Sequence, residues 1–450
     1  MVDQRRSYWK TTAAAIVAAA VSGAAATWAA ASWHPASSAL VSIAGIGTII
    51  VATIVGLWAI VVVAGGFIAL RRDALEEEGI PYAPLEPREW HAGPLVRRLR
   101  AGARAVRALL RPNAERLDLR AGELVEVRSL AEIRRTLDDR GALDGVMFMP
   151  EMAGACGRRF RVYRRLDKLN DWIGHTGLRR MRDTVYLAGA RCDGSGHAGC
   201  QAACYLRWKE SWLRRVADDP PTAPGGARDA DAPGIDAPAD LQRLARRTAG
   251  DGSELFVCQA TELSAGTTPL RRADPRHYVR DLVTGNIALR PLLTGVAILA
   301  FNTVQRRRRG VTYPCLDLPD RKTSPHLALD LTPGELVRVR SKREIEETLN
   351  SGSRNRGLWF DPEMVRFCGG EYRVAARVDR LVDERTGRFQ IVNTPCIVLD
   401  GVAASGEYLG FCAQNEVILW REIWLARVAA AASAAGTGVT ALTSARSPSP

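Results

Sequence analysis

The stretch GELVEV at residues 122–127 returns as GELVRV at residues 334–339, a shift of 212 positions. At the same shift, residues 117–216 align with residues 329–428. Three further motifs recur in this register: Phe148-Met149-Pro150-Glu151-Met152 with Phe360-Asp361-Pro362-Glu363-Met364, Cys156-Gly157 with Cys368-Gly369, and Trp208 to Leu213 with Trp420 to Leu425. Self-similarity at a fixed spacing indicates one fold used twice.

Each copy opens with the same local pattern. Apolar and polar residues alternate over residues 123–127, which predicts a strand. Ser129 and Glu132 have the spacing of a capping box at the start of a helix, and Ser341 and Glu344 repeat it. Further short apolar runs predict more strands. We therefore expect each copy to be a small, partly open β-barrel with one short helix.

Residues that recur in both copies are expected to have structural roles. The recurring glutamates are predicted to accept hydrogen bonds from backbone amides or to pair with recurring arginines. The recurring glutamates are the equivalent pairs Glu151/Glu363 and Glu210/Glu422. Their predicted arginine partners are the pair Arg161/Arg373 or the pair Arg165/Arg377. The tryptophans are predicted to lie in the core, with an aromatic ligand-binding face as the alternative. They are Trp208, Trp212, Trp420 and Trp424.

Two apolar stretches, about residues 11–33 and 38–70, precede the repeats. Each is long enough to cross a hydrocarbon core of roughly 30 Å. Basic residues lie before the first stretch and after the second, whereas the short link at residues 33–37 has no Lys or Arg. The positive-inside rule then predicts a transmembrane helical hairpin with both ends, and the body, in the cytoplasm. A buried pair of helices is the alternative.

The net charge of +13 comes largely from arginines between residues 97 and 111 and from the run at residues 306–309. These basic runs lie beside apolar segments, which favours anionic lipid as a partner over nucleic acid. A basic amphipathic helix at about residues 93–111 is expected to lie on the membrane or to pack on the first repeat. The apolar helix at about residues 287–305 is expected to be buried, with a membrane contact as the alternative.

The nine cysteines suggest a metal site, since disulfides are not expected in a reducing compartment. The Gly-rich loop from Cys192 to Cys204 holds three thiols and one imidazole. Zinc prefers four nitrogen or sulfur ligands, and an iron–sulfur cluster is the less favoured cofactor. The candidate metal ligands are Cys156, Cys192, His197, Cys200 and Cys204.

The second copy keeps only part of this ligand set. Cys368 and Cys412 stand where the first copy has Cys156 and Cys200. The positions of Cys192, His197 and Cys204 are taken by Ala404, Leu409 and Glu416. Two interpretations remain open. Either the first copy alone binds metal, or the recurring cysteines are buried core thiols in both copies, with redox chemistry a minor alternative.

Three motifs of the first copy resemble an uncharacterised bacterial family with no known activity, from about residue 117 onward. They are residues 148–152, the loop Arg191–His197 and the strand Trp208–Leu213. This resemblance implies a bacterial protein, and with the hairpin a location in the inner (plasma) membrane, although typical members lack the hairpin. The opening of each copy is also similar to the SH3-like barrels of the Mind-bomb type, which implies a fold and no function.

Together these features predict an α+β protein with a mainly β body, in which tandem SH3-like barrels flank a helical middle segment. The predicted domains are the hairpin (1–72), a linker with the basic helix (73–116), repeat 1 (117–218), a flexible linker (219–240), the helical middle segment (241–325), repeat 2 (326–430) and a disordered tail (431–450).

The sequence contains no catalytic motif: it has no Walker loop, no HExxH and no GxSxG. We therefore expect a membrane-anchored binding or scaffold protein that carries a structural zinc and has a protein partner. The alternative is a metal-dependent enzyme, or an accessory subunit of one, that uses the loop from Cys192 to Cys204.

Overall fold

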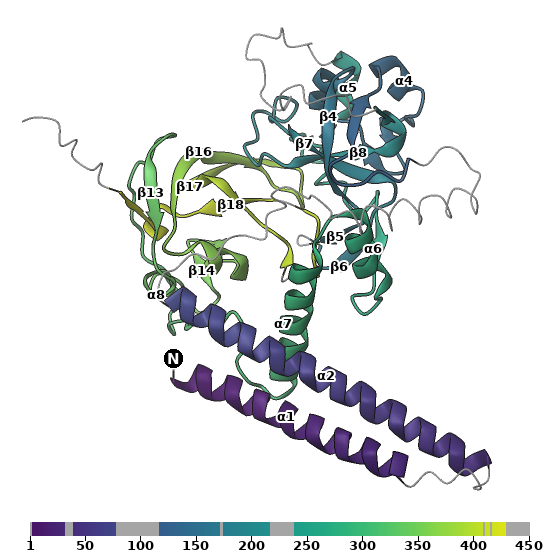
Figure 1. Cartoon of the computed structure of the whole chain (residues 1–450). Coiled ribbons are helices and arrows are strands. Elements are labelled where there is room, and N and C mark those ends of the chain that lie inside the picture. The colour runs from purple at the N-terminus through teal and green to yellow at the C-terminus, as the bar shows by residue number, and fades with distance from the viewer. Residues whose placement is uncertain are drawn as a thin grey trace, which may run out of the picture.

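The computed structural model describes residues 2–31, 39–77, 117–171, 174–216, 238–407, 410–414 and 416–428. The chain has a mixed α+β fold, with long helices at one end and two larger sheets in the body (Figure 1). The predicted basic helix at 93–111, most of the linker at 219–240 and the tail at 431–450 lie outside the described residues.

Two long N-terminal helices, α1 (Val2–Ala31) and α2 (Ala39–Glu77), lie side by side (Figure 1). They run antiparallel: the Trp9 ring meets the Phe67 ring edge-on at 5.8 Å, and Ser22 lies next to Gly56. Among the described residues, one helical stretch, Ile50–Glu76, is long and apolar enough to cross a membrane.

A third helix, α7 (Leu289–Arg307), crosses α2 near the body. The crossing is close, because a Cβ on Gly65 would lie 2.1 Å from the carbonyl oxygen of Ala297. On the same face, Phe301 is fully buried and its ring lies 5.1 Å from that of Tyr8 in α1. Helix α7 thus packs on α1 and α2 with one side buried, while its Leu289 and Leu293 side chains are more than half exposed.

Helix α6 (Arg276–Thr284) precedes α7. It ends at Gly285, whose φ of 83° lies in the left-handed region that glycine adopts most easily at the end of a helix.

The first repeat contains a five-stranded antiparallel sheet of order β8-β7-β4-β1-β9. A single 3-10 turn, η2 (Glu210–Trp212), joins its last two strands in the chain. The strands are β1 (Leu124–Val127), β4 (Arg159–Arg165), β7 (Thr184–Arg191), β8 (Tyr205–Lys209) and β9 (Leu213–Arg215).

The second repeat contains a sheet with the same order, β18-β17-β16-β13-β19. Its register is also the same: Leu124 pairs with Arg161, and Leu336, 212 positions on, pairs with Arg373. The strands are β13 (Leu336–Val339), β16 (Glu371–Val382), β17 (Phe389–Ala403), β18 (Val417–Trp420) and β19 (Leu425–Arg427). The sequence repeat is therefore a repeat of strand order and register.

The short helices begin as the sequence predicts. Both capping boxes are formed, Ser129 with Glu132 at α4 and Ser341 with Glu344 at α8. The short helices and 3-10 turns are α4 (Leu130–Arg134), α5 (Ala239–Leu244), α8 (Lys342–Glu346), η1 (Pro150–Ala155), η3 (Pro362–Phe367) and η5 (Glu422–Trp424).

The middle segment is not wholly helical, contrary to the prediction. Its strand β12 adds to a hairpin of the first repeat, which is long-range pairing that local sequence preference does not reveal. The small strands are β2 (Ala142–Leu143), β3 (Val146–Met147), β5 (Lys168–Asp171), β6 (Gly177–Arg180), β10 (Arg246–Thr248), β11 (Glu254–Phe256), β12 (Thr268–Pro269), β14 (Arg354–Asn355) and β15 (Leu358–Trp359).

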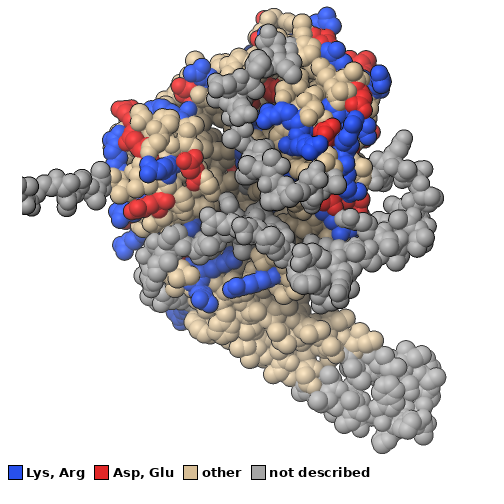
Figure 2. All heavy atoms as spheres, turned by 45° about the horizontal axis from the view of Figure 1, so that its top comes forward, with Lys and Arg blue, Asp and Glu red and all other residues tan. Residues whose placement is uncertain are grey.

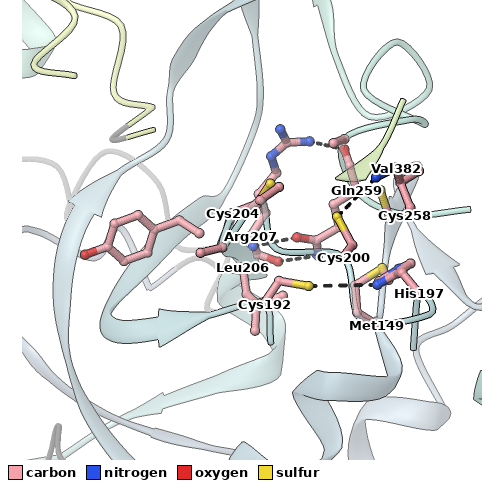
Figure 3. Close-up of a pocket in the computed structure, with 14 residues that line it drawn as sticks. Met149, Cys192, His197, Cys200, Cys204, Leu206, Arg207, Cys258, Gln259 and Val382 are labelled. Carbon is pink, nitrogen blue, oxygen red and sulfur yellow. Dashed lines mark hydrogen bonds between the residues drawn. The ribbon is translucent and has the colours of Figure 1, made fainter. Parts of the chain in front are cut away.

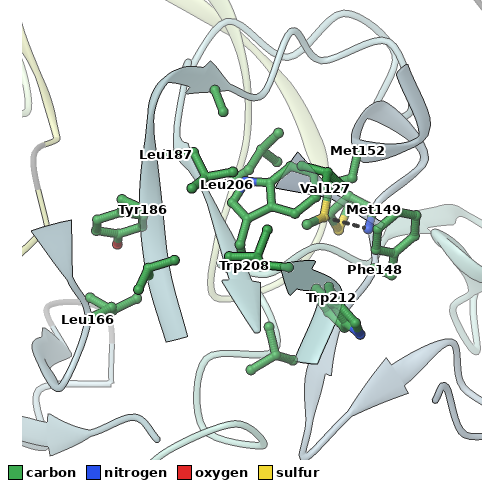
Figure 4. Packing of buried hydrophobic residues seen from close by; sticks show 14 of the residues in the cluster. Val127, Phe148, Met149, Met152, Leu166, Tyr186, Leu187, Leu206, Trp208 and Trp212 are labelled. Atoms are coloured by element: carbon green, nitrogen blue, oxygen red, sulfur yellow. Dashed lines mark hydrogen bonds between the residues drawn. The ribbon is translucent and has the colours of Figure 1, made fainter. Parts of the chain in front are cut away.

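The tryptophans form the core of each repeat, as predicted. Trp208 and Trp212 are fully buried, and Phe148 meets both rings edge-on at 6.3 and 5.4 Å (Figure 4). In the second repeat Trp424 is fully buried, and its ring lies 5.3 Å from that of Phe360.

The recurring glutamates after β8 and β18 fasten the start of each repeat. Glu210 accepts hydrogen bonds from the amides of Asp118 and Leu119, at 3.0 and 2.9 Å, and pairs with Arg165. Glu422 accepts the equivalent amide bonds in the second repeat and pairs with Arg377 at 2.6 Å. The predicted structural role of these two residues is confirmed.

The two repeats exchange contacts symmetrically. The β5–β6 hairpin of repeat 1 reaches a loop of repeat 2, where the Asn170 amide donates to Sγ of Cys412 at 3.1 Å. In return, the β16–β17 hairpin reaches repeat 1, where the Val382 amide donates to Sγ of Cys200 at 3.3 Å. Asn170 and Val382 are 212 positions apart, as are Cys200 and Cys412. The repeats thus meet as an approximate two-fold pair, with the same patch used on each side.

Candidate metal centre

The loop from Cys192 to Cys204 folds back on itself between β7 and β8. The Cys192 amide donates to the carbonyl of Cys204 at 2.8 Å, which closes the loop at its base. Gly194 has a φ of 75°, and a Cβ there would lie 2.1 Å from the carbonyl oxygen of Cys200. Only glycine allows this close approach, so Gly194 lets the loop fold back onto the backbone of Cys200.

Glu151, from turn η1, holds the imidazole of the loop. Its Oε1 lies 2.8 Å from Nδ1 of His197 and accepts the amide of Gly196 at 2.9 Å. Sγ of Cys192 lies 3.7 Å from the same oxygen and 3.9 Å from Nδ1. Ligand atoms of Glu151, Cys192 and His197 therefore all lie within 4.8 Å of one another, close enough to share one ion.

The electrostatics of the group formed by Glu151, Cys192 and His197 favour the ionised form of the Glu151 side chain. Burial opposes ionisation of Glu151, but the hydrogen bond and the charge of His197 outweigh it, so the pKa of Glu151 is lowered. His197 is 2% exposed, and its Nε2 has no hydrogen-bond partner among the described residues. A carboxylate on one ring nitrogen with the other ring nitrogen unused is how metal-binding histidines are commonly oriented.

A cavity of about 50 Å³ lies beside this loop (Figure 3). This volume is enough for an ion or a water molecule. The residues with ligand chemistry that line it are four cysteines and the histidine, namely Cys192, His197, Cys200, Cys204 and Cys258.

Cys258 comes from the middle segment, and the sequence reasoning missed it. The next residue, Gln259, inserts its amide group between two strands of repeat 1: its Oε1 accepts the Arg207 amide at 2.7 Å, and its Nε2 donates to the carbonyl of Met147 at 2.7 Å. Cys258 has no characteristic spacing to the loop cysteines, so only the folded chain reveals its position.

Burial raises the pKa of the thiols of Cys192, Cys204 and Cys258. The thiol of Cys258 raises the pKa of Cys192 and Cys204 further, because like charges would repel across the cavity. These thiols hold their protons at neutral pH unless a cation compensates the charge, and a bound metal supplies that compensation.

Cys156, the fifth predicted ligand, is not among the residues that line the cavity. It packs against the hydrophobic core of repeat 1, and burial raises its pKa to about 11. Four of the five predicted residues, Cys192, His197, Cys200 and Cys204, therefore line one cavity, together with Cys258. Of the predicted residues, only Cys192 and His197 lie in a group close enough to share an ion, and Glu151 is its third member. The available signal for Glu151 was that Glu363 stands at the same position of repeat 2, but this recurrence indicated a structural role.

The equivalent loop of repeat 2 has the same backbone but different chemistry. Gly406 has a φ of 75°, and a Cβ there would lie 2.1 Å from the carbonyl oxygen of Cys412. Sγ of Cys412 lies 3.0 Å from Oε1 of Gln414, whereas Cys396 lies beside Arg421. Among the described residues of this repeat, no three potential ligands lie close enough to share an ion.

No protein family, no curated protein and no solved structure matches this chain.

Proposed function

We propose that this chain is a membrane-anchored binding or scaffold protein of the bacterial inner membrane, with a cytoplasmic body and a structural zinc in its first repeat. The observation that carries the proposal is the apolar arm formed by α1 and α2. Side chains such as Ile54, Leu57 and Ile60 are 59 to 60% exposed along it. Water disfavours so large an exposed apolar surface, whereas a bilayer accommodates it.

The distribution of charge supports this topology. No Lys, Arg, Asp or Glu lies between residues 11 and 70, and Figure 2 shows the described part of the arm without charged side chains. Exposed basic residues occupy the end of the arm nearest the body, where Arg308 donates to the carbonyl of Lys10 at 3.1 Å. They are Arg6, Lys10, Arg71 and Arg306–Arg309. This position suits contact with anionic headgroups and does not call for nucleic acid.

The body supports recognition of a protein partner. In repeat 1 the first strand, β1, lies between β4 and the last strand, β9, and in repeat 2 β13 lies in the same way between β16 and β19. A 3-10 turn, η2 or η5, separates the last two strands of each repeat. This arrangement supports the proposal that each repeat is a small SH3-like barrel. The edge strands of such barrels are of the kind to which extended peptides add as a further strand.

Topology is the first test of this proposal. The full chain, expressed in bacteria, should remain in the membrane fraction after alkaline carbonate extraction. A fluorescent protein fused after residue 450 should fluoresce, and alkaline phosphatase inserted in the link at 33–37 should be active. Replacing Ile54 and Leu57 with Asp should release the chain, whereas Ala at both positions should not. Extraction of the unmodified chain by carbonate would disprove the anchor.

The cavity favours a second candidate function, a metal-dependent enzyme or an accessory subunit of one. Nε2 of His197, which has no hydrogen-bond partner in the described part of the chain, and the carboxylate of Glu151 would provide an acid–base pair next to the proposed ion. A catalytic zinc keeps an open coordination position, whereas a structural zinc has four protein ligands. Addition of azide to the Co²⁺-substituted protein distinguishes the two, because only an open site changes its visible spectrum.

A further inference from the structure

We propose that Cys258 is a ligand of this metal site, so that one Zn²⁺ ion ties the middle segment to the first repeat. This inference rests on the zinc site proposed above and adds a ligand from outside the repeat. The sulfur-rich cavity that Cys258 completes has four thiols around about 50 Å³ (Figure 3). Zinc selects such sets of sulfur and nitrogen donors.

The position of Cys258 is fixed by its neighbours. The Cys258 amide donates to Oγ1 of Thr261 at 2.9 Å, and the Val257 amide donates to the carbonyl of Ala245 at 2.9 Å. On the other side, Nε2 of Gln259 donates to the carbonyl of Arg207 at 3.0 Å. Hydrogen bonds on both sides therefore hold the backbone of Cys258 beside the cavity. Among the described residues, no group of three ligand atoms within 4.8 Å of one another includes Cys258, so its side chain must turn towards the ion as the ion binds.

The other donors approach the cavity from the loop. Cys200 lies under the Val382 amide, and such N–H···S bonds support a thiolate ligand. His197 is oriented by Glu151, which leaves its Nε2 unpaired among the described residues. Zinc takes four of the five donors. Each thiol that binds releases one proton to the solvent, and the ion remains divalent throughout, so no oxidant is required.

Zinc content tests the proposal with a matched control. The full chain, purified in detergent under reducing conditions, should contain one zinc per molecule by elemental analysis. Cys258→Ser should bind zinc at least about tenfold more weakly in a chelator competition. Cys315→Ser, in the same segment but outside the cavity, should bind like the wild type.

The outcomes separate the two proposals. Wild-type protein that neither contains zinc nor takes up added Zn²⁺ would refute the structural zinc, and with it the role of Cys258. Loss of zinc from Cys200→Ser but full retention in Cys258→Ser would refute the role of Cys258 alone.

Alkylation of the wild-type protein gives a second test, which does not depend on whether a variant folds. The rate of iodoacetamide labelling of each cysteine, followed by peptide mass spectrometry, is measured in two conditions: with Zn²⁺ alone added, and after a chelator has removed it. Zinc should slow the labelling of Cys258 and Cys204 and leave that of Cys315 unchanged. Equal labelling of Cys258 in both conditions would overturn the proposal.

Discussion

The amide nitrogen of Val382 donates to Sγ of Cys200 at 3.3 Å, and the two residues belong to different repeats. The same bond joins Asn170 to Cys412 in the opposite sense. Packing between the repeats is therefore enough to explain why a cysteine recurs at the position of Cys200 and Cys412. It does not explain Cys192, His197 and Cys204, which only the first loop has, and these three residues are the stronger sign of a metal.

The first prediction compares the two recurring glutamates. Glu210→Ala leaves the Arg165 side chain, which is 1% exposed, without its closest carboxylate, and should cost about 3 kcal/mol of stability. Glu422→Ala should cost less, about 1 kcal/mol, because the Arg377 side chain is 31% exposed and water replaces the lost partner. Thermal unfolding in detergent measures both, and equal losses would contradict this account.

The second prediction concerns the loop glycines. Gly194→Ala and Gly406→Ala should both lower the unfolding temperature, because each added Cβ meets a carbonyl oxygen at 2.1 Å. Gly122→Ala is the control: its φ of 87° costs about 1 to 3 kcal/mol of strain, but nothing lies within 4 Å. Zinc affinity should fall in Gly194→Ala alone. A similar fall in Gly406→Ala would place a metal in the second loop instead.

The third prediction tests the crossing of α2 and α7. Gly65→Ala should destabilise the helices by about 1 to 3 kcal/mol, because the new methyl group would lie 2.1 Å from the carbonyl oxygen of Ala297. Gly23→Ala, in α1, where the added Cβ would meet no described atom within 4 Å, should be neutral or stabilising by up to about 1 kcal/mol. The measurement is the thermal unfolding midpoint in detergent. No difference between the variants would show that α7 does not pack at this point.

The fourth prediction is a pH dependence at the first capping box. Hydrogen bonds from the side chain and amide of Ser129 lower the pKa of Glu132 from 4.5 to about 2. A lowered carboxyl pKa means that the ionised form is favoured in the folded state. The contribution of Glu132 is thus complete above pH 4.5 and disappears as the pH falls towards 2. The gap in unfolding temperature between wild type and Glu132→Gln should narrow over this range, and a constant gap would contradict the assignment.

Much of the repeat architecture could be predicted from the sequence, because it depends on local patterns that occur twice. Alternating residues give β1 and β13, and the Ser–Glu spacing gives both capping boxes. Buried tryptophans and paired glutamates follow from recurrence, since residues that persist in two diverged copies usually serve the fold they share.

The full lining of the cavity could not be predicted, because it comes from distant parts of the chain. Cys258 reaches the cavity through contacts of Gln259 with Met147 and Arg207, and no short motif encodes them. Cys156 was predicted to approach the loop from elsewhere in the repeat, but it follows η1 and packs against the core of repeat 1.

The reciprocal exchange of hairpins has a consequence for how the two loops can differ. In a dimer of identical subunits, a two-fold axis obliges both loops to carry the same residues, so a substitution in one is imposed on the other. Joining the halves in a single polypeptide removes that obligation. One loop is then free to keep its sulfur and nitrogen donors while its counterpart, in the same scaffold, loses them.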